Sequence, residues 1–353
     1  MNHVAKLQAL LASSEAEAML LTSEISQRYA VGFHFSDGFV LLLQDKTYLI
    51  TDFRYREEAM REVDGSITVI TPTVAIDFIR DTLRDARVSR LMYEDFATTC
   101  ATYTALLAPL GLTLVPIGEA IQTLRAVKDA EEIECIRRAQ AITDAAYTHI
   151  LSVLTPTMTE VDVVLELEFF MRRHGADGVA FPSIAVSGAS SALPHGLPSR
   201  KPLSRGFLTM DFGALVNGYA SDMTRTVSLG KATAEMKHIY ATVLEAQRLG
   251  IEAIAAGVPG KLVDAAARTH INAAGYRGLF GHSFGHGVGL EIHEMPRLSA
   301  RSDLPLAVGN VVTAEPGIYR EGSCGCRIED MGVVTEEGFW DLTASSKELI
   351  ELF

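Results

Sequence analysis

The sequence contains few cysteines. Only four occur among 353 residues, at positions 100, 135, 324 and 326. Their small number and wide scatter exclude the disulfide framework of a small secreted domain. Cys324 and Cys326 form a Cys-x-Cys pair, whereas a zinc ribbon needs two such pairs. We therefore expect four free thiols and a reducing compartment.

Long apolar runs are also missing. The nearest example, Gly38 to Leu43, ends at Gln44. It is far shorter than the roughly 20 residues that a membrane-spanning helix requires. The first twenty residues mix Lys6 and Glu15 with apolar neighbours, which is typical of an amphipathic helix and not of a signal peptide. We expect a cytoplasmic protein without a membrane partner.

Positive charge is in deficit. Lysine and arginine together number 31, against 44 aspartates and glutamates, so the formal net charge is -13. Such a surface repels nucleic acid and anionic membranes, and no cluster of basic residues offsets the repulsion. We therefore expect no nucleic-acid partner.

The chain is long enough for two domains. At 353 residues it exceeds the usual size of one hydrophobic core. Apolar residues make up 48% of it, which is ordinary for a globular protein. We place the boundary between residues 124 and 125. The expected domains are therefore residues 1–124 and residues 125–353.

The N-terminal domain alternates short strand-like and helix-like segments. This alternation is typical of a small α/β domain. The expected strands cover residues 40–43, 47–51, 66–70 and 90–93, and the expected helices cover residues 54–61 and 75–85.

The C-terminal domain repeats one order of elements. Asp129 and Glu132 form a capping-box pattern that starts a helix running to residue 154. A second helix follows over residues 159–174. Helices over residues 234–255 and 259–274 repeat this order, and strand-like segments follow each pair. We interpret this domain as two structurally related halves, so the expected fold class of the whole chain is α/β.

A tight hairpin is predicted around Asn217 and Gly218. This dipeptide separates two strand-like runs, and Asn-Gly is the strongest short-range hairpin signal. A two-residue turn would place Asp211 opposite Thr224. Because side chains alternate along a strand, Asp211 and Asp222 would then lie on one face, with Cβ atoms roughly 7 Å apart.

Two carboxylates on one face repel each other unless protons or cations intervene. A pair of divalent ions about 3.5 to 4 Å apart would fit between Asp211 and Asp222. The alternative is an exposed hairpin face that carries two solvated aspartates. The hairpin alone does not decide between these two interpretations.

Three histidines, His282, His286 and His293, occur in the glycine-rich segment from Gly281 to Glu294. A phosphate-binding loop is not indicated, because no Lys-Ser or Lys-Thr follows. A zincin helix is not indicated either, because no second histidine follows His293 at the required spacing. The clustering favours metal ligation over a structural role, and the glycines would let the backbone approach a crowded site.

Further acids stand in strand-like, apolar surroundings. Glu315 ends the run that starts at Val311, and Glu329 and Asp330 lie within the run from Arg327 to Val334. Burying an acid is costly unless it is paired or bound to a metal. Periodicity leaves open whether Glu329 or Asp330 faces inward.

Taken together, these segments resemble the prolidase and aminopeptidase P branch of the pita-bread metallopeptidases. The similarity covers roughly residues 125–353. The N-terminal domain is similar to the creatinase-type domain that precedes the catalytic domain in this family. The matching motifs are Thr-Met-Asp-Phe-Gly (209–213), Ser-Asp-Met-Thr-Arg-Thr (221–226), Gly-His-Gly-Val-Gly-Leu-Glu-Ile-His-Glu (285–294), Ala-Glu-Pro-Gly-Ile-Tyr (314–319) and Arg-Ile-Glu-Asp (327–330).

The resemblance implies a centre of two divalent metal ions with five ligands. Asp211 would hold one ion and His286 with Glu315 the other, while Asp222 and Glu329 would bridge both. This assignment selects Glu329 over Asp330. The resemblance implies manganese or cobalt, and zinc or iron is also compatible with oxygen-rich ligation.

The resemblance also implies the residues that surround the substrate. His195 and His293 match two histidines that flank it, and Arg297 matches an arginine that binds its terminal carboxylate. Arg327 matches an arginine near the metals and the substrate, and Thr224 would donate a hydrogen bond behind the ligands. Two departures concern specificity only: the segment 188–191 lacks an asparagine often found there, and Cys326 replaces a common apolar residue.

The expected activity is hydrolysis of the peptide bond before proline by a dinuclear metallopeptidase. Glu315 would take up a proton from the attacking water, and His293 would stabilise the oxyanion. His195 or a water relay would protonate the leaving prolyl nitrogen. Because Arg297 would bind a free carboxylate, we expect small Xaa-Pro dipeptides as substrates. The resemblance further implies a homodimer.

Several alternatives differ from this expectation. An aminopeptidase P-like enzyme would accept longer peptides with proline in second place. Methionine aminopeptidase in its simplest forms lacks a leading domain, and creatinase lacks the ligand set. A non-catalytic peptide-binding module on the same fold would have lost ligands, and all five are present here.

Overall fold

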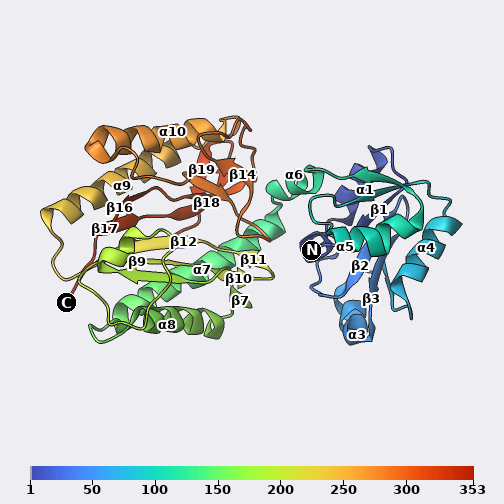
Figure 1. The fold of residues 1–353 in the computed structure, drawn as a ribbon, viewed down its shortest axis with the longest axis horizontal. Helices are drawn as coiled ribbons and strands as arrows, with labels where there is room; N and C mark the ends of the chain where they lie inside the picture. The colour runs from blue at the N-terminus through green and yellow to red at the C-terminus, as the bar shows by residue number, and fades with distance from the viewer. Residues whose placement is uncertain (1) are drawn as a thin grey trace. The chain divides into compact units, whose positions relative to one another are not determined.

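The structure is a computed structural model that describes residues 2–353. It divides into two compact units, one ending at Arg125 and the other running from Ala126 to Phe353. Each unit has its own sheets and its own core (Figure 1). Among the described residues, no helix has both the length and the apolar character required to cross a lipid bilayer.

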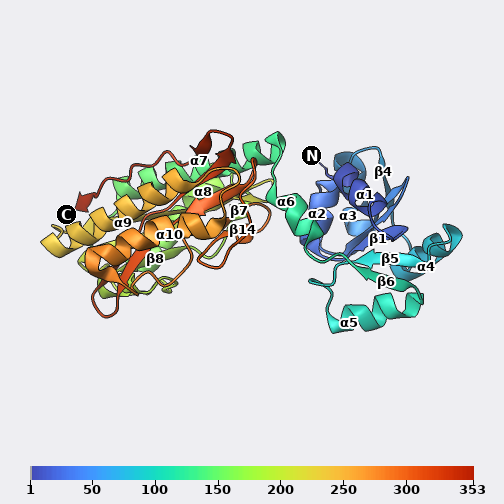
Figure 2. The same cartoon turned by 90° about the horizontal axis from the view of Figure 1, so that it is seen from above.

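The N-terminal unit is built on one mixed six-stranded sheet with helices packed around it (Figures 1 and 2). The sheet order is β4 (Ile67–Ile70), β3 (Thr47–Thr51), β2 (Gly38–Leu43), β1 (Ala18–Leu21), β5 (Arg90–Tyr93) and β6 (Thr113–Pro116). The helices are α1 (Val4–Ala12), α2 (Glu24–Val31), α3 (Phe53–Glu62), α4 (Ala75–Asp85), α5 (Cys100–Thr102) and α6 (Ala120–Ala126).

The prediction of one helix through the first twenty residues was wrong beyond residue 12, and its first residue lies outside the described ones. Helix α1 ends at Ala12, and residues 18–21 form β1 in the middle of the sheet. All four residues of β1 are buried and apolar; all four pair with β2, and the first three also pair with β5. A strand buried on both faces reads as a short continuous apolar run, which periodicity alone cannot distinguish from a helix.

The C-terminal unit consists of two halves, each with two helices followed by strands. The first half contains α7 (Ala130–Val153), α8 (Glu160–Arg173), β7 (Gly178–Val179), β8 (Ile184–Ser187), β9 (Gly206–Phe212), β10 (Ala214–Val216), β11 (Tyr219–Ala220) and β12 (Met223–Leu229). The second contains α9 (Ala234–Ala253), α10 (Gly260–Ile271), β13 (Gly285–Gly287), β14 (Glu294–Leu298), β15 (Val311–Ala314), β16 (Gly317–Arg320), β17 (Cys324–Arg327), β18 (Asp330–Thr335), β19 (Gly338–Asp341) and β20 (Glu351–Leu352). This order confirms the predicted α/β fold class with two related halves.

The predicted helix starts are confirmed by their caps. Asp129 accepts hydrogen bonds from the first turn of α7, and Glu132 reaches back to the Asp129 backbone. Thr159 and Asp162 form the same reciprocal arrangement at the start of α8. Each arrangement satisfies backbone N–H groups that have no partner within the helix, which fixes where the helix begins.

Each half has its own core. Helices α7 and α8 bury Ile150 and Leu167 against apolar residues of β8, β9 and β12. Helices α9 and α10 bury Val243 and Val263 against β15 to β18. The helices therefore lie on the outside and the strands between them, as Figure 1 shows. This layering leaves the inner strands to carry the polar residues of the site.

The hairpin around Asn217 and Gly218 has the predicted register. Val216 pairs with Tyr219, and Asp211 pairs with Thr224. Both turn residues have positive φ, 49° at Asn217 and 77° at Gly218, as a type I′ turn requires. The sequence therefore determines which residue of β9 faces which residue of β12.

Replacing Gly218 by alanine should destabilise the protein. A residue with a Cβ pays about 1 kcal/mol for the left-handed conformation that this turn imposes. We expect a lower midpoint of thermal unfolding for Gly218→Ala and almost no change for Asn217→Gly, because glycine tolerates the same φ. Equal melting temperatures for Gly218→Ala and the wild type would contradict this account of the turn.

Candidate metal centre and substrate cavity

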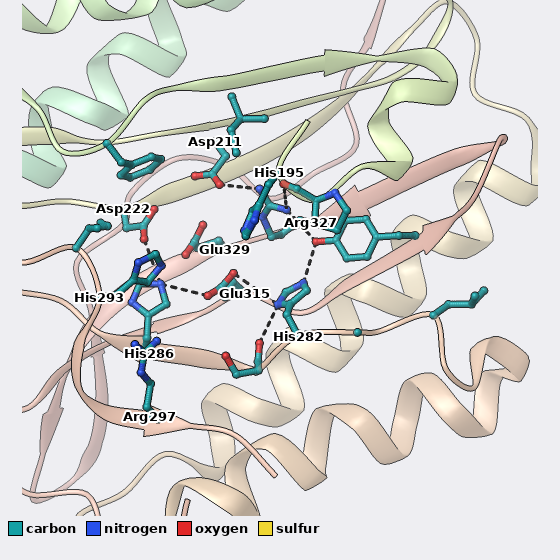
Figure 3. Close-up of a pocket in the computed structure, with 18 of the residues that line it drawn as sticks. His195, Asp211, Asp222, His282, His286, His293, Arg297, Glu315, Arg327 and Glu329 are labelled. Carbon is teal, nitrogen blue, oxygen red and sulfur yellow. Dashed lines mark hydrogen bonds and ion pairs between the residues drawn. The ribbon is translucent and has the colours of Figure 1, made fainter. Parts of the chain in front are cut away.

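A cavity of about 690 Å³ opens in the C-terminal unit between residues far apart in the sequence (Figure 3). Nine of the ten predicted site residues line it, and the tenth, Thr224, contacts one of them. The nine are His195, Asp211, Asp222, His286, His293, Arg297, Glu315, Arg327 and Glu329.

Asp222, His286 and Glu329 form the centre of this cluster. One potential ligand atom of each lies within 4.8 Å of the other two, and all three residues are buried. Asp222 lies between β11 and β12, His286 in β13, and Glu329 between β17 and β18. Three segments of the chain thus bring their donor atoms to one point.

The orientation of His286 favours a cation in front of its ring. Its Nδ1 lies 3.1 Å from the Gly287 carbonyl oxygen, to which only an N–H can donate. In the neutral ring, the Nε2 lone pair then faces a Glu315 oxygen at 3.3 Å and an Asp222 oxygen at 3.5 Å. Three electron-rich atoms facing one another are stable only with a proton or a metal ion between them.

Asp211 presents an unused oxygen to the cavity. Its Oδ2 accepts a hydrogen bond from Arg327 at 2.6 Å. Its Oδ1 is buried, and within the described residues it has no hydrogen-bond partner. Leaving a carboxylate oxygen unpaired away from water is costly, and a metal ion would supply the missing partner. The donor set therefore fits divalent cations, which prefer carboxylate and imidazole ligands.

The acids in the cavity alter one another's protonation. Burial and then the neighbouring carboxylates raise the pKa of Asp222 and of Glu329 well above their ordinary values. Burial also raises the pKa of Asp211, although Arg327 opposes it. For Glu315, burial acts in the same direction but is outweighed by the hydrogen bond and charge of a protonated His286, followed by His282 and Arg327, which together lower the pKa to about 2.

Hydrogen-bond donors behind the cluster orient the carboxylates. The Thr224 hydroxyl donates to Glu329 at 2.6 Å and accepts from the Arg327 Nε at 2.9 Å. The same guanidinium group donates to Asp211. Thr224 pairs with Asp211 in the sheet as predicted, but its hydroxyl is directed to Glu329. Partners of this kind fix the direction of carboxylate lone pairs.

The structure places Glu329 in the cavity and Asp330 behind it. Asp330 accepts a hydrogen bond from the fully buried Arg225 at 2.7 Å and others from Gln247 and Lys347. Arg225 also donates to the backbone carbonyl of Glu329. The expected continuous strand is wrong here, because residues 328 and 329 separate β17 from β18. Between Glu315 and Glu329, strands β16 and β17 form an antiparallel hairpin.

The remaining predicted residues lie on the side of the cavity that is accessible to solvent. His195, His293 and Arg297 are exposed. Arg297 pairs with His286 across β13 and β14, and the ring centroids of His286 and His293 are 4.3 Å apart. Partial burial, His286 and Arg297 lower the pKa of His293 to about 4. His293 is therefore a neutral imidazole at pH 7.

Two further polar residues line the cavity: His282, which belongs to the histidine cluster predicted to bind metal, and Tyr319, which had no predicted role. His282 shares a hydrogen bond of 2.9 Å with the Tyr319 hydroxyl, which in turn accepts from Arg327 at 2.8 Å. Tyr319 is the last residue of the matched motif 314–319, whereas His282 precedes the motif that starts at Gly285. Their contact joins residues 37 positions apart, so spacing along the chain could not have revealed it.

Two family models match this chain along most of its length. The model for metallopeptidase family M24 matches residues 134–336, and the model for the creatinase/prolidase N-terminal domain matches residues 3–127. The chain belongs to metallopeptidase family M24. The protein is thus a metallopeptidase with the pita-bread fold, and this family implies divalent metal ions.

Close relatives span the whole chain. An uncharacterized peptidase of Bacillus subtilis is 44% identical over 349 residues, which covers 98% of this chain and 99% of the relative. The solved structure of an Xaa-Pro dipeptidase from Bacillus anthracis has a TM-score of 0.95 and 41% identity, and 99% of each chain is covered. An X-Pro aminopeptidase from Thermotoga maritima has a TM-score of 0.94 and 36% identity over 100% of both chains.

The stabilisation of this M24 protein by Mn²⁺ should grow with pH. Raised pKa values mean that Asp222 and Glu329 stabilise the metal-free fold at low pH and lose this contribution as pH rises through their folded-state values. Because a cation competes with those protons, Mn²⁺ binds more tightly at higher pH. We expect a larger increase in melting temperature with Mn²⁺ at pH 8 than at pH 5.5.

Differential scanning calorimetry after removal of metal with a chelator would measure this shift. Asp222→Asn should reduce the shift at both pH values, whereas the exposed Asp303→Asn should behave like the wild type. A shift in melting temperature that is equal at both pH values, or greater at pH 5.5, would contradict the inferred competition between protons and Mn²⁺.

Proposed function

We propose that this metallopeptidase hydrolyses the peptide bond before proline, with Xaa-Pro dipeptides as its main substrates. The observation that carries the proposal is the convergence of five metal-type donors on one cavity, with Arg297 directly across the strand pair from His286. The names of the solved relatives, an Xaa-Pro dipeptidase and an X-Pro aminopeptidase, support the choice of proline.

We propose that two divalent cations occupy the cluster. Asp211 would hold one and His286 with Glu315 the other, while Asp222 and Glu329 would be shared. When bound, the ions would supply a water acidic enough to react as hydroxide at neutral pH and would polarise the scissile carbonyl. Manganese or cobalt is the proposed metal, by resemblance, and zinc or iron is chemically compatible.

The protein's own acids would handle the proton of the attacking water. Glu315 lines the cavity and is ionised at neutral pH, so its position makes it the proposed proton acceptor. Thr224 and Arg327 would hold the neighbouring carboxylates in place throughout, because each donates to an oxygen of Glu329 or Asp211. The acids thereby keep their lone pairs directed into the cavity.

Two histidines would act on the substrate. His293 is neutral at pH 7 and can donate an N–H to the oxyanion that develops on the scissile carbonyl. A prolyl nitrogen carries no hydrogen and must be protonated before it leaves. His195 lines the same cavity and is the proposed donor, directly or through a water molecule.

Arg297 would select short substrates. Its guanidinium group lies at the cavity, where it can bind the free carboxylate of a dipeptide through two hydrogen bonds. A longer peptide has an amide at that position and lacks the charge. This difference is the reason for preferring dipeptides over the longer substrates of an aminopeptidase.

The proposed assembly rests on the resemblance, and the proposed location rests on the sequence. We propose a homodimer formed through the N-terminal unit. We also propose a cytoplasmic location and a small peptide as the substrate.

Turnover of Ala-Pro in the presence of Mn²⁺ tests the proposed function. We expect hydrolysis of Ala-Pro, loss of activity with a chelator, and recovery when Mn²⁺ is added back. Chromatography of the released alanine and proline would measure the turnover. Faster cleavage of Ala-Pro-Ala than of Ala-Pro would favour the aminopeptidase. A metal-loaded protein that cleaves neither would reject both.

Substitution of Arg297 should weaken recognition of the substrate's terminal carboxylate. We expect Arg297→Met to lower kcat/KM for Ala-Pro by roughly tenfold or more, as for the loss of a charge-assisted hydrogen bond. Ala-Pro amide should be affected little, because it lacks the carboxylate. Arg301→Met, an exposed substitution four residues further on, serves as the control. An equal loss on both substrates would disprove carboxylate recognition by Arg297.

A further inference from the structure

One wall of the cavity is a glycine-rich segment, residues 278–283, which follows helix α10. Five of the pocket residues outside the metal cluster belong to it: Gly278, Leu279, Gly281, His282 and Ser283. Gly278 has a φ of 80°, so the segment includes a backbone conformation that other residues adopt rarely. Glycine loses more conformational freedom on ordering than any other residue. Specific contacts are therefore needed to hold this wall in one shape.

Arg268 of helix α10 supplies such contacts. Its guanidinium group donates to the Phe280 carbonyl through Nη1 at 2.6 Å and to the His282 carbonyl through Nη2 at 2.6 Å. The two carbonyls stand on either side of Gly281, the most flexible point between them. The guanidinium group also lies over the Phe280 ring, 4.2 Å from its centroid.

Asp264 fixes the guanidinium group from the other side. It accepts hydrogen bonds from the Arg268 Nε and Nη2, each at 2.7 Å, and it is almost completely buried. One of its oxygens also accepts from the Phe284 backbone N–H at 3.1 Å. Asp264 and Arg268 are four residues apart on one helix, the spacing at which side chains meet. We call this arrangement of Asp264, Arg268 and the backbone of 280–284 the α10 clamp.

The α10 clamp acts on residues that reach the centre of the cavity. Within the clamped segment, His282 bonds to Tyr319 across the cavity wall. Phe284, whose N–H is held by Asp264, offers its own carbonyl to the Glu315 N–H at 2.8 Å. Val263 and Ala267 of α10 are fully buried in the core of this half, so the helix is a fixed support.

We propose that Arg268, held by Asp264, is a positioning residue that keeps the wall 278–283 in the shape that receives the peptide substrate. The part about the substrate rests on the proposed function. Four hydrogen bonds diverge from one planar group here, and a lysine cannot form them together, because its ammonium group is a single point donor. A positive charge at position 268 is therefore insufficient to hold the wall; the planar guanidinium group is needed.

Arg268→Lys and Arg268→Ala test the proposal, with Arg248→Ala as the matched control. Arg248 forms comparable ion pairs, with Glu245 and Glu252, on the neighbouring helix α9 and is not among the described residues that line the cavity. In both Arg268 variants we expect faster amide hydrogen exchange in residues 278–284 than in the wild type. We expect a roughly 10- to 100-fold lower kcat/KM for Ala-Pro, as for loss of a supporting residue, with Mn²⁺ affinity within about twofold of wild type. Arg248→Ala should match the wild type.

Three results would overturn the proposal: unchanged exchange in 278–284, faster exchange with unchanged kcat/KM, or a loss of Mn²⁺ affinity as large as the loss of kcat/KM. Arg268→Lys keeps the charge next to the buried Asp264, so it remains informative if Arg268→Ala fails to fold. If the wild type cleaves no Xaa-Pro peptide, the proposed function fails. The exchange comparison needs no substrate and then decides whether the clamp holds the wall.

Discussion

Four carboxylates and one imidazole share a buried space in which each ionised acid raises the energy of the next. Burial and mutual repulsion raise the pKa of Asp211, Asp222 and Glu329, and His286 directs a lone pair at two of the acids when it is neutral. This arrangement is unfavourable without cations and favourable with them, since opposite charge at short range offsets the cost of burial. The surrounding fold must hold the acids together against that repulsion.

The fold holds three of these acids at positions where a β-strand has just ended or is about to begin. Asp222, Glu315 and Glu329 each stand just outside a strand, where the alternation of side chains no longer dictates direction. At Glu329, and at Asp211 within β9, fixed donors direct the acid. Arg327 and Thr224 bind the carboxylate oxygens, and the buried Arg225 binds the backbone carbonyl of Glu329 from behind. Positive groups behind the acids thus take over the role that strand pairing has elsewhere.

How much of this could be predicted depended on sequence separation. Asn217 and Gly218 determined the hairpin register, because a type I′ turn constrains both neighbouring strands and placed Asp211 opposite Thr224. The choice between Glu329 and Asp330 could not be made from periodicity, because the strand is interrupted at that point. The contact of Tyr319 with His282 could not be predicted, because the two residues are 37 positions apart in the chain. The buried run of β1 was mistaken for a helix, because strand pairing decides its conformation.

The residues that hold the acids and the residues that hold the cavity wall come from different elements of the fold. The donors behind the acids come from the strands that carry the acids, so movement of one strand would disturb ligands and donors together. The wall at 278–283 is held instead by α10, a helix that contributes no metal-type ligand. A wall with separate support can change shape without separating the acids. On the proposed role of Arg268, recognition of the peptide and retention of the metal would be separable within one cavity, whereas Asp264 connects α10 to the Glu315 backbone through Phe284.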